Sequence, residues 1–232
     1  MIQINNLIKS FDKKVAVDMA SLSIKQGEIL GVVGNNGAGK TTFFRLLLDL
    51  LQADSGYVTF FDKDVSKSEE WKTYTGSFID NSFLIECLFP EEYFDFIGKV
   101  YQINEEDIRE RLKDYSQLMN GEILEQKKYI RNMSSGNKQK IGITGAMLIN
   151  PKILILDEPF NFLDPSSQIE MKRLLLHLNK TLNTTILVSS HNIQYIADIC
   201  SRIILLEKGN IIRDEKAVTA ETKTELENYF RM

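Results

Sequence analysis

One stretch of nine residues constrains this chain more than any other feature of its sequence. Residues 34–42 fit the pattern G-x-x-x-x-G-K-[ST]. Glycines at these positions let the backbone turn tightly, so that successive N–H groups point inward and form a nest for an anion. A helix that starts there adds the positive end of its dipole. The pattern therefore predicts a phosphate-binding loop. Its residues are Gly34, Asn35, Asn36, Gly37, Ala38, Gly39, Lys40, Thr41 and Thr42.

Two side chains of this loop have specific chemical roles. Lys40 is placed to reach the β- and γ-phosphates of a nucleotide, and the Thr41 hydroxyl is placed to ligate Mg²⁺. An apolar segment that suits a buried strand, residues 28–33, precedes the loop, and a helical segment, residues 43–51, follows it. Strand, glycine loop and helix in this order are the context that supports the motif. We therefore expect the loop of a nucleoside triphosphatase.

Composition sets broad limits on the fold and the partners. The 232 residues, 43% of them hydrophobic, suffice for one large α/β domain, or for a core domain with a smaller one inserted. The net charge of −4 favours no nucleic-acid partner. The cysteines Cys87 and Cys200 lie far apart and lack metal-ligand spacing, which fits a reducing cytoplasm.

Nothing in the sequence predicts that the chain itself enters a membrane. The first residues lack the charged and apolar blocks of a signal peptide. No apolar run approaches the roughly 20 residues that span a bilayer. We therefore expect any membrane role to come through a partner.

The order of predicted elements indicates an α/β fold. Residues 1–33 suggest antiparallel strands, and Pro90 followed by acidic residues marks a helix start. Apolar runs at 153–156, 185–188 and 202–206 suggest later strands, the first two of the parallel type. The predicted fold is a P-loop core with a mostly parallel sheet, N-terminal antiparallel strands and an inserted helical subdomain.

The same pattern predicts domain limits. We assign residues 1–75 and 146–232 to the ATP-binding core with its N-terminal β-subdomain. We assign residues 76–145 to the helical subdomain.

Two acidic residues and a histidine follow two of the predicted strands. Asp157 and Glu158 come directly after residues 153–156, at the sheet edge where ligands bind in open α/β folds. Asp157 is placed to hold Mg²⁺ opposite Thr41, and Glu158 to accept a proton from an attacking water. His191 follows the next strand and is placed to bond the γ-phosphate. The alternative for the carboxylates is an acidic surface turn.

A further motif links the chain to a known family. Residues 133–140 read M-S-S-G-N-K-Q-K, which resembles the signature L-S-G-G-Q-x-Q-R, and they stand before the strand that leads to Asp157. With the phosphate loop and the acidic pair in the family's order, the chain resembles the ATP-binding subunit of an ABC transporter over roughly residues 2–212. The resemblance implies ATP and Mg²⁺ as ligands, and an ATPase that works on the cytoplasmic face of the membrane through a permease.

The family also implies a head-to-tail dimer with a second ATP-binding subunit. Each ATP is held there between one subunit's phosphate loop and the other subunit's signature. A serine hydroxyl, backbone N–H groups and a helix N-terminus make a second anion site, in agreement with this arrangement. The signature residues expected at the nucleotide are Ser134, Ser135, Gly136 and Asn137.

Three other segments match the family by position. Phe11 stands where the family places an aromatic ring that stacks on adenine, although a core phenylalanine is the alternative. Residues 160–164 match the loop that contacts the partner across the dimer, and His191 matches the switch histidine. An aromatic cluster within residues 83–96 suggests either a groove for the permease or the core of the helical subdomain.

Several positions depart from the family pattern. Asp80 stands where a glutamine or glutamate is usual, and we expect it to meet Mg²⁺ or water with a shorter reach. Ser135 replaces a glycine, Asn137 replaces a glutamine, and Phe162 replaces a small residue of the dimer-contact loop. These changes predict a slow or partner-tuned ATPase.

Three functions compete at this level. The first is the energy subunit of a transporter, with export favoured by the run D-E-P-F-N-F-L-D-P at residues 157–165. The second is a soluble ABC-type ATPase in an assembly process without a transported substrate. The third is a nucleotide sensor that does not hydrolyse ATP.

Overall fold

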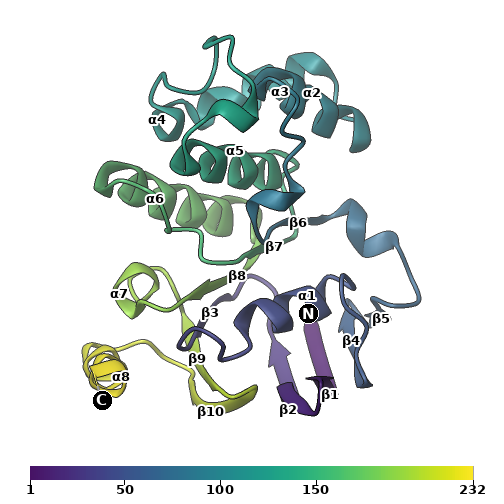
Figure 1. Ribbon diagram of the computed structural model, residues 1–232, viewed down its shortest axis with the longest axis vertical. Helices are drawn as coiled ribbons and strands as arrows, with labels where there is room; N and C mark the ends of the chain where they lie inside the picture. The colour runs from purple at the N-terminus through teal and green to yellow at the C-terminus, as the bar shows by residue number, and fades with distance from the viewer. Residues whose placement is uncertain (232) are drawn as a thin grey trace.

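The computed structural model describes residues 1–231, except for the side chains at positions 227, 230 and 231. Two sheets and their covering helices form the structure (Figure 1). The strands are β1 (Ile2–Phe11), β2 (Lys14–Ile24), β3 (Ile29–Val33), β4 (Ser55–Phe60), β5 (Lys63–Asp64), β6 (Thr75–Phe78), β7 (Ile153–Leu156), β8 (Thr185–Ser190), β9 (Arg202–Glu207) and β10 (Asn210–Glu215). The α-helices are α1 (Lys40–Leu47), α2 (Pro90–Val100), α3 (Glu105–Asp114), α4 (Ser116–Met119), α5 (Ser135–Leu148), α6 (Pro165–Leu182), α7 (Ile193–Ile196) and α8 (Ala220–Arg231).

The central sheet has six strands in the order β10-β9-β3-β8-β7-β6. All neighbours from β9 to β6 pair in parallel, and β10 adds an antiparallel edge. Every residue of β3, β7 and β8 is buried, as expected for strands covered on both faces. The parallel arrangement places the carboxyl ends of β3, β7 and β8 at one edge of the sheet.

The second sheet has four antiparallel strands in the order β2-β1-β4-β5. The expectation of antiparallel pairing over residues 1–33 is right for β1 and β2 and wrong for β3. Strand β3 pairs in parallel with β8 and β9. Strand β3 lies between β9 and β8 in the central sheet, and after α1 the chain enters β4 of the other sheet. The apolar residues of β3 are buried without a break, as in a parallel strand covered on both faces, and do not alternate as in a half-exposed antiparallel strand.

The two faces of the central sheet pack against different elements. Along β7, Ile153 and Ile155 belong to one hydrophobic cluster, while Leu154 and Leu156 belong to the other. Alternate residues of a strand point to opposite faces, so each cluster lies on one face. The first face packs on α1 and the four-stranded sheet, and the second on helices that include α5 and α6.

Helices α2 to α5 lie together at one end of the molecule (Figure 1). Helix α2 begins at Pro90, as expected, and the Glu92 carboxylate accepts a hydrogen bond of 2.9 Å from the Phe89 N–H before it. Strand β6 crosses the predicted domain limit at residue 76, and α5 crosses the limit at 145. The division into core and helical subdomain stays a prediction, and Met232 lies outside the described residues. Within residues 1–231, no helix is long and apolar enough to cross a bilayer.

Helix α5 packs closely on strand β6. A Cβ atom added at Gly142 would lie 1.9 Å from Cε2 of the Phe78 ring, and one at Gly76 would lie 2.0 Å from the Ala146 carbonyl oxygen. These glycines let the helix approach the edge of the sheet that also carries β7.

We predict that Gly142→Ala destabilises the protein by about 1–3 kcal/mol, the usual cost of overpacking a core. Alanine normally stabilises a helix relative to glycine, so the sign of the effect isolates the contact with Phe78. Urea unfolding measures the change. The double variant with Phe78→Leu should lose less stability than the sum of the single variants. A Gly142→Ala protein as stable as the parent would contradict this packing.

Candidate functional site

The predicted phosphate-binding loop connects β3 to α1 at the carboxyl edge of the central sheet. Gly39 has φ 109° and precedes the first residue of α1, where an added Cβ would lie 2.3 Å from the Ala16 carbonyl oxygen. No side chain caps the start of α1. The first N–H groups of the helix therefore remain available to an anion, which agrees with the nest that the sequence predicts.

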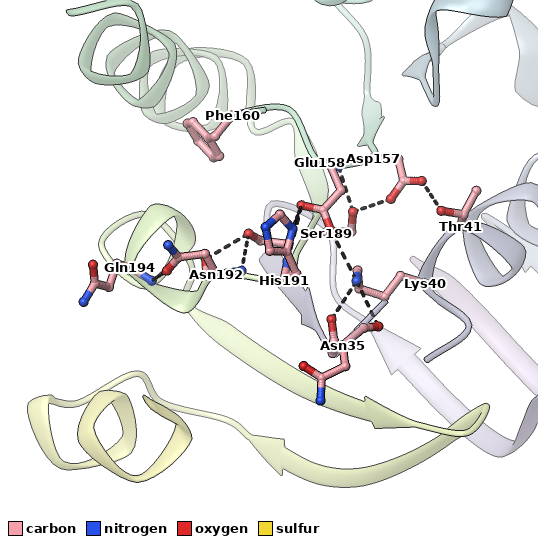
Figure 2. A network of polar contacts seen from close by, with 12 residues as sticks. Asn35, Lys40, Thr41, Asp157, Glu158, Phe160, Ser189, His191, Asn192 and Gln194 are labelled. Carbon is pink, nitrogen blue, oxygen red and sulfur yellow. Dashed lines mark hydrogen bonds and ion pairs between the residues drawn. The ribbon is translucent and has the colours of Figure 1, made fainter. Parts of the chain in front are cut away.

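Lys40 is buried at the centre of the loop (Figure 2). Its Nζ donates to the Gly34 carbonyl at 2.6 Å and to the Asn35 carbonyl at 3.4 Å. It also pairs with Glu158 Oε1 at 3.2 Å. A buried ammonium needs such partners because desolvation penalises the charged form. The loop and the acidic residue after β7 are thus in direct contact.

Asp157 is held between two hydroxyl groups. The Thr41 hydroxyl donates to Asp157 Oδ2, and the Ser189 hydroxyl donates to Asp157 Oδ1 (Figure 2). Burial raises the pKa of the Asp157 carboxyl, and the two hydroxyl donors partly oppose this shift. The structure therefore brings together Thr41 and Asp157, which the sequence predicts as metal ligands.

The donor set near Thr41 fits Mg²⁺ bound mainly through other ligands. Among the described residues, no group of three or more His, Cys, Asp or Glu side chains is arranged to hold a metal ion. Thr41 and Asp157 supply two hard oxygen donors. Mg²⁺ is typically bound by one or two protein oxygens together with waters and substrate phosphates. The residues present fit a metal that arrives with a nucleotide.

Glu158 links three parts of the site. Its Oε1 pairs with Lys40, and its Oε2 lies 2.9 Å from His191 Nδ1 (Figure 2). Its own N–H donates to the Ser189 hydroxyl at 2.8 Å. The structure therefore gathers Lys40, Glu158 and His191 as the sequence predicts.

Phe11 lines a pocket of about 400 Å³ together with residues 36–42 and Glu158. Its ring is 47% exposed. The alternative of a core phenylalanine is wrong, because the ring lies at the end of β1, beyond the part of the strand that packs on the core. Lys9 Nζ lies 5.6 Å from the centroid of the ring, and the role of Phe11 in stacking on adenine stays a prediction.

The signature residues lie apart from the phosphate-binding loop. They are Ser134, Ser135, Gly136 and Asn137. They form the start of α5, where the Ser134 hydroxyl accepts a hydrogen bond of 3.2 Å from the Asn137 N–H. They do not line the pocket that contains Lys40 and Phe11. The predicted nucleotide-binding residues therefore form two groups on the described part of the chain.

Asp80 has partners of its own. Its Oδ2 lies 3.1 Å from Arg45 Nη2, and its Oδ1 accepts a bond of 2.8 Å from the Ser82 N–H. It thereby caps the short helical turn that follows β6. Its assignment as a metal ligand stays a prediction. No pattern in the sequence pointed to its contact with Arg45, one helical turn after Thr41.

The aromatic cluster of residues 83–96 divides between core and surface. Tyr93 and Phe94 are buried, while Phe83 and Phe96 are exposed. Phe89 stacks on Tyr129 at a centroid distance of 4.4 Å. The interpretation as core of the helical subdomain is right for Tyr93 and Phe94, and the groove for the permease stays a prediction.

Sequence reasoning missed the role of Ser189. Strand β8 pairs in parallel with β7, with Val188 opposite Leu156, so the next residue of each strand reaches the same edge. The sequence signal for this role is the serine hydroxyl that directly follows the apolar residues 185–188 of β8.

Comparison with known proteins decides the family. The sequence model of the family described as ABC transporter matches residues 17–161, more than half of the chain. The chain belongs to the ABC transporter family. It is an ABC-type ATPase cassette, as its motifs predict.

Curated relatives of the cassette carry several names. It is 33% identical over 92% of its length to the bacitracin transport ATP-binding protein BcrA of Bacillus licheniformis. It is 34% identical over 91% of its length to the methionine import ATP-binding protein MetN 2 of Listeria monocytogenes. An uncharacterized ABC transporter ATP-binding protein of Synechocystis sp. is 31% identical over 83% of the chain. The matches span 69%, 65% and 54% of these relatives, respectively.

Solved structures confirm the fold of the cassette. A dimeric bacterial ABC transporter cassette superposes with a TM-score of 0.84 at 23% identity, over 95% of this chain and 100% of that one. An ATP-binding subunit of an ABC transporter superposes with a TM-score of 0.86 at 20% identity, over 100% of both chains. The predicted α/β P-loop core with antiparallel strands and added helices is therefore confirmed.

We predict that Asp157→Asn stabilises the nucleotide-free protein at neutral pH. The folded-state pKa of Asp157 is raised, so its ionised form opposes folding once the pH exceeds the unfolded-state pKa. The gain from asparagine should therefore shrink as the pH falls from the raised folded-state pKa to the ordinary pKa of an aspartate. Urea unfolding of both proteins across pH measures this difference.

Asp18→Asn, which changes an exposed carboxyl on β2, is the control and should leave stability nearly unchanged. An Asp157→Asn protein that unfolds at lower urea than the parent at pH 7 would show that the two hydroxyl bonds outweigh burial.

Proposed function

We propose that this chain is the ATP-hydrolysing subunit that powers an ABC transporter through ATP-driven dimer closure. The observation that carries the proposal is the separation of the two nucleotide-binding groups. One group lines the pocket that contains Lys40 and Phe11. The other group lies at the start of α5, outside this pocket. A second ATP-binding subunit in head-to-tail orientation supplies the missing group to each nucleotide.

Binding of ATP uses residues from three elements. The exposed ring of Phe11 stacks on adenine, which recognises a π face and gives weak selectivity for the base. The N–H groups of residues 34–42 and the Lys40 ammonium bind the phosphates. Thr41 and Asp157 hold Mg²⁺, which when bound screens the phosphate charge.

Hydrolysis follows from the contacts of Glu158. Lys40 pairs with both the loop carbonyls and Glu158. The phosphates of ATP compete for the same ammonium, so their arrival leaves the Glu158 carboxylate free to take a proton from the attacking water. His191, 2.9 Å from Glu158, orients that carboxylate and bonds the γ-phosphate.

The partner completes the site with the start of its α5. The Ser134 hydroxyl and the helix N-terminus, with Ser135, Gly136 and Asn137, contact the γ-phosphate of the opposite subunit. This step explains why a single chain should hydrolyse ATP slowly. In a solved relative at 23% identity the cassette is dimeric, and another structure is described as a post-hydrolysis state bound to ADP and Pi.

The membrane partner is an integral permease on whose cytoplasmic face the cassette sits. The exposed rings of Phe83, in the turn after β6, and of Phe96, on α2, offer it apolar surface. Relatives named for bacitracin transport and for methionine import support a role in transport. We propose export as the direction, on the resemblance of residues 157–165 to exporter subunits, and we expect no nucleic-acid partner.

We predict that Glu158→Gln lowers ATP turnover by about 10²-fold or more, the usual contribution of a general base. The variant should still bind ATP and should form an ATP-dependent dimer that persists longer than that of the parent. Steady-state phosphate release and size-exclusion chromatography with ATP measure the two effects.

Glu122→Gln changes an exposed carboxylate that lies between α4 and α5 in the sequence. It is the matched control and should behave as the parent. A Glu158→Gln protein as active as the parent would remove Glu158 from the base role. A parent with no turnover above that of Glu158→Gln would favour the nucleotide sensor.

We also predict that tagged Glu158→Gln protein with ATP captures a polytopic membrane protein from detergent-solubilised native membranes. Mass spectrometry of the captured material identifies the partner. Capture of soluble proteins only would favour an assembly ATPase instead.

Transport assays with vesicles that contain the permease test the direction. ATP-driven uptake of the transported molecule into inside-out vesicles would support export. Uptake into right-side-out vesicles only would support import.

A further inference from the structure

The backbone of Glu158 adopts a conformation that side-chain-bearing residues rarely populate. Its φ is 48°, in the left-handed region. Crowding between Cβ and the backbone disfavours this region for residues other than glycine. Such a residue keeps its conformation only where the surrounding structure holds it.

Three groups hold the backbone of Glu158. Its N–H donates to the Ser189 hydroxyl at 2.8 Å. Its carbonyl oxygen accepts a bond of 3.1 Å from the Asn161 N–H, which closes the local turn. The same oxygen accepts a second bond of 3.2 Å from Gln139 Nε2. Asn161 belongs to the same turn as Glu158, and Ser189 lies at the end of the neighbouring strand β8. Gln139, in contrast, lies on helix α5.

Gln139 lies in a tight contact between α5 and the segment after β7. Its side chain is buried, with 5% exposure. One turn earlier in the helix, a Cβ atom added at Gly136 would lie 2.6 Å from the Phe162 carbonyl oxygen. Helix α5 therefore approaches the backbone of this segment at two places, Phe162 and Glu158. At Glu158 the contact is the hydrogen bond from Gln139.

We propose that Gln139 is a positioning residue for Glu158. Its amide fixes the peptide carbonyl and so keeps the Glu158 carboxylate between Lys40 at 3.2 Å and His191 at 2.9 Å. The helix that offers its N-terminus to the nucleotide of the opposite subunit thereby also holds the base of its own site. This inference rests on the proposed role of Glu158 as general base.

The test removes the amide and keeps the size of the side chain. Gln139→Leu and Gln139→Met both lack the N–H donor, and the flexible thioether of methionine adapts to the space. We expect kcat to fall about ten-fold in both, because small displacements of a catalytic group have effects of this order or larger. The affinity for ATP should stay within about two-fold of the parent, since the phosphate loop is untouched. Gln117→Leu, on the surface of α4, is the matched control.

A second measurement separates positioning from other roles. In the Glu158→Gln background, adding Gln139→Leu should cause no further loss of residual turnover, because the residue it positions is already disabled. It should also leave the yield of the ATP-dependent dimer unchanged. A weaker dimer would show that Gln139 acts through the start of α5 on the partner's nucleotide, and would overturn the proposal.

Two further outcomes are decisive. Unchanged kcat in both single variants, with unfolding midpoints like that of the parent, would overturn the role of Gln139. A Glu158→Gln protein as active as the parent would instead show that the proposed base role is wrong, whatever the Gln139 variants do.

Discussion

The buried ammonium of Lys40 is the group on which the arrangement of the site depends. A cation with 6% exposure must be compensated, and here two loop carbonyls and the Glu158 carboxylate do so. The same carboxylate reaches His191. One buried charge thus connects the ends of β3, β7 and β8. Parallel pairing makes this possible, because it brings the carboxyl ends of all three strands to one edge.

Helix α5 adds a second constraint, on the position of the segment that follows β7. Glycines at positions 76, 136 and 142 let it lie against β6 and against the segment after β7 at distances that a methyl group would prevent. Gln139 then bonds the backbone of Glu158. Close packing of this kind transmits displacement rather than absorbing it. A movement of the start of α5 would therefore change the position of Glu158.

The positions that depart from the family pattern have physical consequences in the fold. Asp80 pairs with Arg45 and caps the turn after β6, so its shorter side chain is held by two partners within the chain. Phe162 is 68% exposed in the loop expected at the dimer contact. An exposed ring there gives a partner subunit apolar surface to cover. We interpret both as features that adjust the rate and the partner, with the Lys40, Asp157 and Glu158 contacts retained.

Features that depend on neighbours along the chain can be predicted from the sequence alone. The glycine spacing of residues 34–42, the acidic pair after an apolar run and the helix start at Pro90 are local patterns, and the α/β class follows from their order. Other features became visible only in the folded chain: β3 pairs in parallel, Phe11 is exposed beside the loop, and Arg45 and Gln139 contact Asp80 and Glu158, respectively. These contacts join residues 35 and 19 positions apart. Periodicity specifies which face of an element is buried, but the partner across a packed interface depends on how whole elements meet.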